Sequence, residues 1–325
     1  MELSKESSQK IQVLRGLAII AVVLIHNTPE GPAQIWCRPF LNFCVGTFLF
    51  LSGMLSHAEQ WHPWKRIKKI LIPYIIWTLI YVIIKNYRTP AQIPVLYLKN
   101  LITSKAATTL YYVFVYCGLT LIIPLIDRLA RSRFKLLGFA VSPLEIILMR
   151  LIPLLSGRTF SNYIEIVMRI SFLGWFNYFY LGYLLGNRLL EIKMPSKKLA
   201  LLWAASIMLQ ILEGYLYFSR GESNCGTQLK LSCILSGMIF VILAYRYIHS
   251  QATAKNTGIL RLLGDCSFGI FFSHLAIMKV LDHVPYYSKY VFYPLNGLIT
   301  ILLSLAFVLI GKKLLGRWSK YLALA

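Results

Sequence analysis

The sequence is poor in charged residues, and poorest in acidic ones. Only 14% of its 325 residues are charged, against about 25% in a typical soluble domain. Twelve Asp and Glu residues stand against 34 Lys and Arg residues. Hydrophobic residues make up 57% of the chain, and the mean hydropathy is +0.62. These proportions exclude an ordinary soluble globular protein and indicate a membrane protein.

Several signatures of catalysis are also missing from the sequence. It contains no Walker A loop, no Gly-rich dinucleotide fingerprint, no His-Glu-x-x-His pair and no Gly-x-Ser-x-Gly nucleophile elbow. The six cysteines have no metal-ligand spacing, and we expect them to be small packing residues. We therefore expect no metal site and no nucleotide-hydrolysis chemistry.

The formal net charge of +22 raises the question of nucleic-acid binding. The basic residues, however, lie between apolar blocks and form no continuous patch of the kind that binds nucleic acid. Retention of Lys and Arg in cytoplasmic loops explains them better. We therefore expect membrane lipids, and no nucleic acid, among the partners.

The apolar residues come in long blocks, several of which approach the ~20 residues that a helix needs to cross a bilayer. They predict an all-α, polytopic membrane protein with about ten transmembrane helices. The fifth span is the weakest, because Pro143, Glu145, Arg150 and Pro153 interrupt it. The predicted spans are approximately residues 13–27, 35–56, 70–88, 107–127, 136–155, 170–187, 199–218, 229–249, 260–281 and 290–311.

The positions of Lys and Arg between these spans predict the orientation of the chain. With the N-terminus inside, most basic residues fall in cytoplasmic segments, and the richest outside segment is the loop 85–106. We therefore expect both termini in the cytoplasm, a multi-pass location in the inner membrane, one domain over residues 1–325 and no cleavable signal peptide. The cytoplasmic clusters are Lys65, Arg66, Lys68 and Lys69; Arg128, Arg131, Arg133 and Lys135; Arg188, Lys193, Lys197 and Lys198; and Lys312, Lys313, Arg317 and Lys320.

Ionisable groups inside a span are costly and mark candidate functional sites. The first span carries Arg15 and His26, eleven residues apart. In a helix, eleven residues correspond to a rotation about 20° larger than three full turns and to a rise of ~16 Å. Both side chains therefore project from one face. Such a face suits an anion held at the entrance and a proton acceptor farther in. The alternative is a charged flank and a hydrogen-bonded packing residue.

Two further elements lie near the next span boundary. The second span ends in Ser52-Gly53, which by itself is a packing motif for close helix contact. A basic cluster beside Trp61 and Trp64 marks a membrane–water boundary. Orientation of the chain explains the cluster most simply, and binding of lipid headgroups or of a ligand's phosphates is an additional interpretation. The cluster consists of Lys65, Arg66, Lys68 and Lys69.

A second intramembrane histidine, His274, lies in the ninth span. Asp265 precedes it by nine residues, which is half a turn out of phase, so the two do not share a helix face. Sequence spacing does not choose among the other possible acid partners of the histidines. These are Glu30, Glu145, Glu165, Glu213 and Asp282.

Taken together, four segments resemble acyltransferase family 3, whose members acylate sugars, peptidoglycan and other envelope acceptors. The order of the segments matches the family, and the resemblance runs through the whole chain. Departures are Leu49, Lys69, Phe268 and Phe271, where the family usually has Phe, Arg, Tyr and Tyr. The segments are Arg15…His26, similar to an arginine–ten residues–histidine signature; Phe48-Leu-Phe-Leu-Ser52-Gly53; Arg66-x-x-Lys69…Pro73-Tyr74; and Ser267-Phe-Gly-Ile-Phe-Phe-Ser-His274.

The resemblance implies a stand-alone membrane domain, without a fused extracytoplasmic hydrolase-like domain. It implies an O-acetyltransferase that moves an acetyl or other short acyl group from acyl-coenzyme A, commonly acetyl-CoA. The acceptor would be a hydroxyl of an envelope polysaccharide or a lipid-linked sugar precursor. His26 would be a general base or carry the acyl group covalently, and Arg15 would hold the donor or the oxygen that gains charge. Lys65, Arg66, Lys68 and Lys69 would bind the coenzyme's phosphates, with His274 and Ser52 as possible additional site residues.

Two other functions remain as alternatives. Ten spans with buried charge also suit an exporter or flippase of a glycan or glycolipid, although no inverted repeat is visible. A sensor or scaffold without catalysis is disfavoured by the short loops and by the lack of a soluble output domain. The sequence names neither the acceptor nor the acyl chain.

Overall fold

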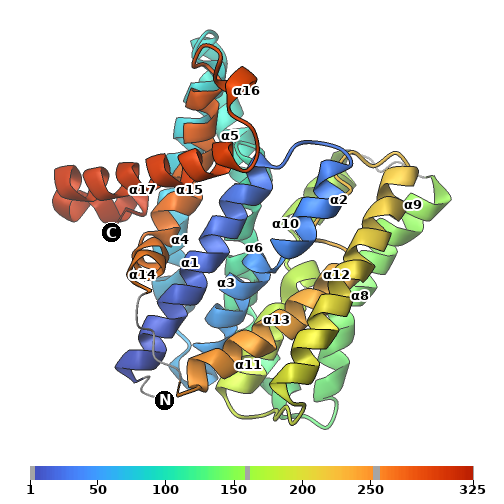
Figure 1. Cartoon of the computed structure of the whole chain (residues 1–325). Helices are drawn as coiled ribbons and strands as arrows, with labels where there is room; N and C mark the ends of the chain where they lie inside the picture. Colours follow the sequence, from blue (N-terminus) through green and yellow to red (C-terminus); the bar gives the residue numbers. More distant parts are fainter. Residues whose placement is uncertain (1–3, 158–161, 252–256, 325) are drawn as a thin grey trace. The chain divides into compact units, whose positions relative to one another are not determined.

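The computed structural model describes residues 4–157, 162–251 and 257–324 (Figure 1). Throughout these residues the regular structure is helical, without a strand, which confirms the all-α prediction. The helices fall into two compact units that are not continuous in sequence. Unit 1 is Met1–Trp61, Ile122–Phe160 and Phe172–Asp265, and unit 2 is His62–Leu121, Ser161–Ser171 and Cys266–Ala325.

Unit 1 contains the first helix and most of the middle of the chain. Its elements are α1 (Lys5–Asn27), α2 (Ala33–Cys37), η1 (Arg38–Phe40), α3 (Phe43–Met54), η2 (Ala58–Gln60), α7 (Ile123–Arg131), η5 (Lys135–Ala140), α8 (Val141–Ile146), the π-helical turn η6 (Ile147–Leu151), α9 (Ile152–Ser156), η7 (Leu173–Trp175), α11 (Phe176–Gly186), α12 (Ser196–Ser219), α13 (Leu231–His249) and α14 (Gly258–Asp265).

Unit 2 contains the third predicted span and the C-terminal part of the chain. Its elements are α4 (Pro63–Asn86), η3 (Pro90–Gln92), α5 (Ile93–Thr103), η4 (Thr108–Leu110), α6 (Tyr111–Leu121), α10 (Asn162–Ile170), α15 (Ser267–Leu281), α16 (Tyr287–Tyr290), α17 (Leu295–Leu315) and η8 (Gly316–Leu322).

Seven helical segments in the described part of the chain are long and apolar enough to cross a membrane, which confirms a multi-pass membrane protein. Two further pairs of consecutive helices raise the number to nine if each pair is one broken span: Thr108–Leu121 with Ile123–Arg131, and Gly258–Asp265 with Ser267–Leu281. The seven are Lys5–Asn27, Ala33–Met54, Pro63–Asn86, Lys135–Ser156, Ser196–Ser219, Leu231–His249 and Leu295–Leu322.

The predicted span 170–187 does not form a helix long enough to cross a membrane. It folds as the turn η7 and the 11-residue helix α11, in which Phe176 to Leu185 are all buried. The apolar block that led to the prediction therefore packs inside unit 1 as a short helix. A count of ten spans, and the cytoplasmic location of both termini, stay predictions.

Helix α3 packs against α11 with almost no space between their backbones. A Cβ atom built on Gly53 would lie 2.0 Å from the carbonyl oxygen of Phe179, closer than atoms can approach. Phe179 is fully buried. The Ser52-Gly53 element therefore does what its sequence predicts, because its glycine permits two helices to approach closely.

The interrupted fifth span is irregular where its prolines and polar residues predict. Helix α8 passes into the π-helical turn η6, which contains Arg150, and α9 then begins with Ile152 and Pro153. Proline has no N–H to donate and its ring crowds the preceding turn, so the regular α-helical hydrogen bonding fails at this point. A π-helical turn widens the helix and absorbs the mismatch.

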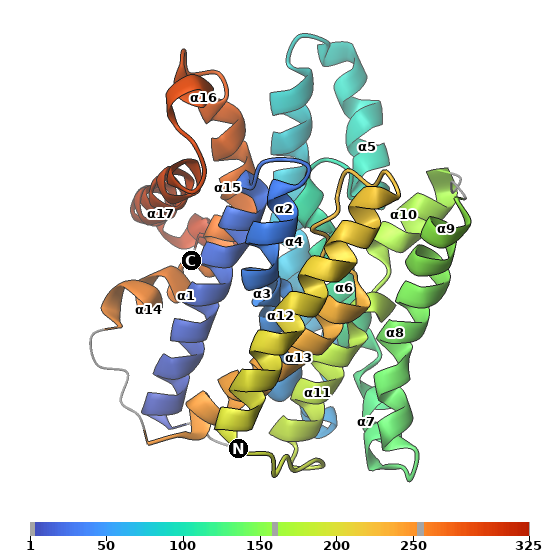
Figure 2. The same cartoon turned by 45° about the vertical axis from the view of Figure 1, so that its right-hand side comes forward.

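In unit 2 the chain folds back after α4 (Figure 2). The Tyr74 hydroxyl, near the middle of α4, donates to the carbonyl oxygen of Leu101 at 2.8 Å, in the last turn of α5. Helices α4 and α5 are therefore antiparallel neighbours, and α5 reaches half-way down α4. Within the predicted outside loop 85–106, Ile93–Thr103 forms a helix that packs on α4. The side of the membrane on which this segment lies stays a prediction.

Candidate functional site

Helix α1 carries both residues of the arginine–histidine pair in one unbroken run. It begins after Ser4, whose hydroxyl accepts a hydrogen bond from the Ser7 N–H at 3.1 Å, and it ends before Thr28, which adopts an extended conformation. Pro29 accounts for this end, because a residue that precedes proline is disfavoured in the helical region. Arg15 and His26 therefore share a helix face, as their spacing predicts.

The face between the two side chains is turned into the protein. Ile19 and Val22 lie between Arg15 and His26 on this face, and they are 0% and 4% exposed. Arg15 and His26 themselves are half-buried. The pair thus brackets an apolar, buried stretch of about 16 Å, with a cation at one end and an imidazole at the other.

Arg15 is held near its own helix. Its Nη1 donates to the Gln12 side-chain oxygen at 3.3 Å. The backbone there is fixed by α14, which packs directly on α1 (Figure 1), because a Cβ on Gly16 would lie 2.0 Å from the Leu260 carbonyl oxygen. Two backbones in contact leave little freedom for the base of the arginine side chain.

His26 lies in the last turn of α1. Among the predicted acid partners, Glu30 is exposed and Glu213 accepts hydrogen bonds from the N–H groups of Leu231 and Ser232 at the start of α13. The Glu165 side chain lies outside the described residues. The acid partner of His26 stays open.

The two additional site candidates differ in their surroundings. Ser52 is half-buried in α3, and its carbonyl oxygen accepts a hydrogen bond from the Ser56 hydroxyl at 2.6 Å. His274 is fully buried in α15, and its Nδ1 pairs with the Ile270 carbonyl oxygen at 2.9 Å. Asp265 and His274 lie on different helices, so the prediction of one continuous helix over 260–281 is wrong at Cys266.

The basic cluster at the start of α4 does not act as one surface. Arg66 is half-buried and lies over the Tyr116 ring, 5.9 Å from its centroid, while Lys65, Lys68 and Lys69 are exposed. On a helical wheel Arg66 is within about 40° of the buried Ile70 and Trp77, whereas Lys65 and Lys68 are more than about 90° away. Arg66 is therefore the cation of this cluster that is directed along the inner face of α4.

This difference gives a testable pair of variants. For the acyl-coenzyme A donor that the sequence resemblance implies, Arg66→Ala is expected to raise KM about 10- to 100-fold, because a hydrogen bond to a charged group is worth ~1.5–3 kcal/mol. Lys68→Ala removes the same charge from the exposed side of the helix and is expected to change KM less than about threefold. Steady-state kinetics of thioester consumption measures both. Equal effects of the two variants on KM would contradict the division of the cluster into an inward-directed Arg66 and exposed lysines.

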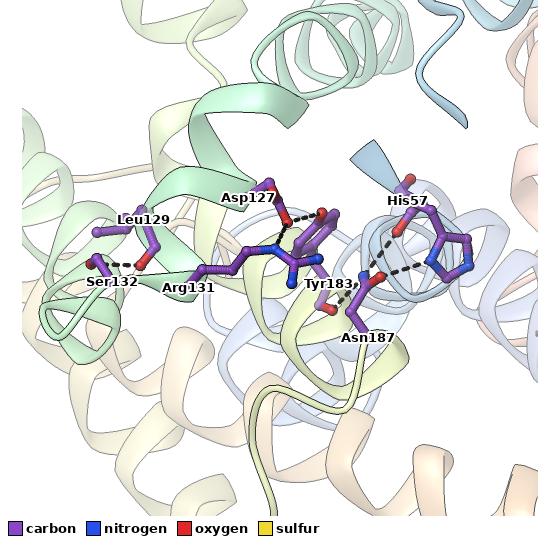
Figure 3. A network of polar contacts seen from close by, with 8 residues as sticks. His57, Asp127, Leu129, Arg131, Ser132, Tyr183 and Asn187 are labelled. Carbon is purple, nitrogen blue, oxygen red and sulfur yellow. Dashed lines mark hydrogen bonds and ion pairs between the residues drawn. The ribbon is translucent and has the colours of Figure 1, made fainter. Parts of the chain in front are cut away.

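Two groups of hydrogen-bonded polar residues in unit 1 were not predicted from the sequence. The first joins the ends of α3, α7 and α11 (Figure 3). The buried Tyr183 hydroxyl donates to Asp127 Oδ1 at 2.7 Å, and Arg131 Nε donates to the same oxygen at 2.8 Å. His57 Nδ1 pairs with the Asn187 side-chain oxygen at 2.7 Å. These bonds hold three helix ends together next to the cluster that begins at Arg128.

The second group surrounds Lys230, which is 0% exposed. Its Nζ donates to the carbonyl oxygens of Cys225 at 3.1 Å and Gln210 at 3.3 Å, and lies 5.9 Å from the centre of the Tyr217 ring. Carbonyl dipoles and a ring face compensate the buried charge. Lys230 thereby attaches the segment before α13 to α12. No local sequence pattern predicts this contact.

The comparison with known families decides the identity of the chain. The profile of a family described as an acyltransferase domain, acyltransferase family 3, matches residues 8–317. The chain belongs to acyltransferase family 3. Searches of curated proteins and of solved structures gave no significant match.

The family profile runs through the residues of both units. The four segments that carried the resemblance lie within it: the α1 pair and the Ser52-Gly53 element in unit 1, and the Arg66 and His274 segments in unit 2. The protein is thus a multi-pass membrane acyltransferase. In its described residues no group of three or more His, Cys, Asp and Glu side chains is arranged to hold a metal ion.

Proposed function

We propose that this acyltransferase moves an acetyl or other short acyl group from acyl-coenzyme A to a hydroxyl of an envelope polysaccharide or a lipid-linked sugar precursor. The donor would bind from the cytoplasm, and the protein would lie in the inner membrane. The observation that carries the proposal is the buried face of α1, with Arg15 at one end and His26 at the other. Membership of acyltransferase family 3 supports it.

In the proposed reaction His26 acts as general base. It takes the proton of the acceptor hydroxyl while the hydroxyl oxygen attacks the carbonyl carbon of the thioester. A C–O bond forms and the C–S bond breaks, and the departing thiolate takes the proton from the imidazolium. The products are the acylated sugar and the free thiol of coenzyme A.

Arg15 is proposed to hold negative charge on the donor or on the thioester oxygen as it is attacked. A guanidinium is permanently charged and donates several hydrogen bonds, so it stabilises an oxyanion in a water-poor site without changing its protonation. The half-buried position of Arg15 and its firmly packed backbone suit this role. Arg66, with Lys69 beside it, is proposed to bind the phosphates of the coenzyme in unit 2.

The test is an assay of purified wild-type protein in detergent with radiolabelled acetyl-coenzyme A and a crude lipid-linked glycan fraction. The proposal predicts consumption of the thioester and transfer of label to the glycan. Intact thioester, together with movement of a labelled glycan across wild-type vesicles, would overturn it in favour of an exporter. Label retained on the protein after rapid quenching would replace the general base with a covalent acyl-histidine.

A further inference from the structure

The chain of unit 2 between α5 and α6 is broken at membrane depth. Helix α5 has 11 residues and spans about 16 Å, so it does not cross ~30 Å of hydrocarbon by itself. The segment Thr108–Leu121 that follows it is also too short by itself and forms a candidate broken span with Ile123–Arg131. Tyr74, near the middle of α4, contacts the last turn of α5 through its hydroxyl and contacts Phe114 of α6 at 5.6 Å between ring centres. The break at residues 104–110 therefore lies about half-way along α4.

The exposed face of α5 agrees with this depth. Val95, Leu98 and Ile102, which follow one another on one side of the helix, are 70%, 63% and 71% exposed. An apolar stripe of this kind is expected of a helix that faces lipid. Irregular backbone at such a depth is tolerated only where it is buried in protein or lines a cavity, and broken helices commonly supply binding sites in membrane proteins.

The break places buried hydroxyl groups that bind nothing else in the described chain. Ser104 is 0% exposed and Thr109 is 3% exposed, and neither hydroxyl has a hydrogen-bond partner among the described residues. A buried hydroxyl without a hydrogen-bond partner lowers the stability of the fold, so it is expected where a ligand supplies the partner on binding. Lys105, between them in sequence, is exposed, which places a cation at the same break.

A third such hydroxyl lies between the break and the basic end of α4. In α15, Ser267 is 1% exposed and its hydroxyl has no partner among the described residues. Phe271 contacts Tyr112 of α6, at 5.4 Å between ring centres. Figure 2 shows α15 running in the same direction as α4 and α6 in the opposite direction. Ser267, one turn before Phe271, is therefore near the level of Tyr116, one turn after Tyr112.

We propose that these hydroxyls bind the amide- and thioester-bearing arm of the acyl donor, with Ser104 and Thr109 at the break as its inner end. The inference rests on the proposed function. Arg66, beside Tyr116, would hold the phosphates at the cytoplasmic end of unit 2. From Arg66 to the level of Tyr74 the helix rises about 12 Å, a distance that the arm of coenzyme A covers. Serine and threonine hydroxyls both donate and accept, which matches the amide N–H and C=O groups of this arm.

The test compares acetyl-coenzyme A with acetyl-pantetheine, which has the same arm and thioester without the nucleotide. The double variant Ser104→Ala, Thr109→Val is expected to raise KM about 5- to 100-fold for both donors, as the loss of two hydrogen bonds predicts. Arg66→Ala is expected to raise KM for acetyl-coenzyme A alone. Thr300→Val is the matched control, because Thr300 is equally buried in unit 2 but its hydroxyl already donates to the Asn296 carbonyl oxygen at 2.8 Å.

Thermal unfolding separates a binding role from a structural one. Removal of unpaired buried hydroxyls is expected to leave the Tm of the double variant unchanged or higher while KM rises. Unchanged KM for both donors, or a KM rise accompanied by a fall in Tm larger than that of Thr300→Val, would overturn the inference. If the wild-type protein consumes neither thioester, the proposed function itself fails, which is a different result from an active wild type with unaffected variants.

Discussion

His26→Ala is expected to lower the rate of acyl transfer about 100- to 10,000-fold, because the acceptor hydroxyl then loses its general base. The substitution lies in the last turn of α1, where the helix already ends at Thr28, so the fold is expected to persist. The rate of label transfer from acetyl-coenzyme A measures the effect. Retention of more than about 10% of the wild-type rate would contradict the role of His26.

A matched control exists in the same unit. His249 also lies in the last turn of a helix, α13, and its Nδ1 pairs with the Tyr245 carbonyl oxygen at 2.8 Å on an exposed surface. His249→Ala therefore removes a histidine from the same kind of helix position without touching the α1 face. Its activity is expected to stay within about twofold of wild type, as is usual for surface substitutions. A comparable loss in both variants would mean that the effect is not specific to His26.

Gly53→Val is expected to destabilise the protein by about 3 kcal/mol, the upper end of the usual cost of overpacking. Its Cβ would meet the Phe179 carbonyl oxygen at 2.0 Å, and a backbone atom on a fully buried helix cannot move aside as a flexible side chain does. A fall in Tm of roughly 5–10 °C in detergent is the corresponding observation.

Gly258→Ala provides the comparison for this variant. Among the described residues no atom lies within 4 Å of a Cβ built on Gly258, and the residue begins α14. Alanine is a better helix former than glycine, so a Tm equal to or slightly above that of wild type is expected. A tolerated Gly53→Val would show that α3 and α11 do not pack as closely as described.

The sequence was sufficient wherever a single helix carried the information. The 3.6-residue period placed Arg15 and His26 on one face of α1, and the prolines around Arg150 indicated the irregular fifth span. Length and apolarity located most of the long helices. Each of these inferences depends on neighbours in sequence, which is why they could be made without a structure.

The remaining features depend on contacts between distant segments. Asp127 and Tyr183 are 56 residues apart, and His57 and Asn187 are 130 apart, so no local pattern links them. The division of the basic cluster into an inner Arg66 and outer lysines required the packing of Tyr116. The break after α5 had one local sign, the polar residues between Ser104 and Thr109 in an apolar region, which were divided between the outside loop 85–106 and the start of the predicted span 107–127.

The sidedness of the donor reaction tests the central claim most directly. Acetyl-coenzyme A does not cross a bilayer, so inside-out and right-side-out membrane vesicles that contain the wild-type protein present only one face to it. The account predicts that inside-out vesicles, with Arg66 and its neighbours exposed to the medium, consume the thioester and incorporate label into a glycan, and that right-side-out vesicles do not. Consumption by right-side-out vesicles alone, or intact thioester in both, would contradict it.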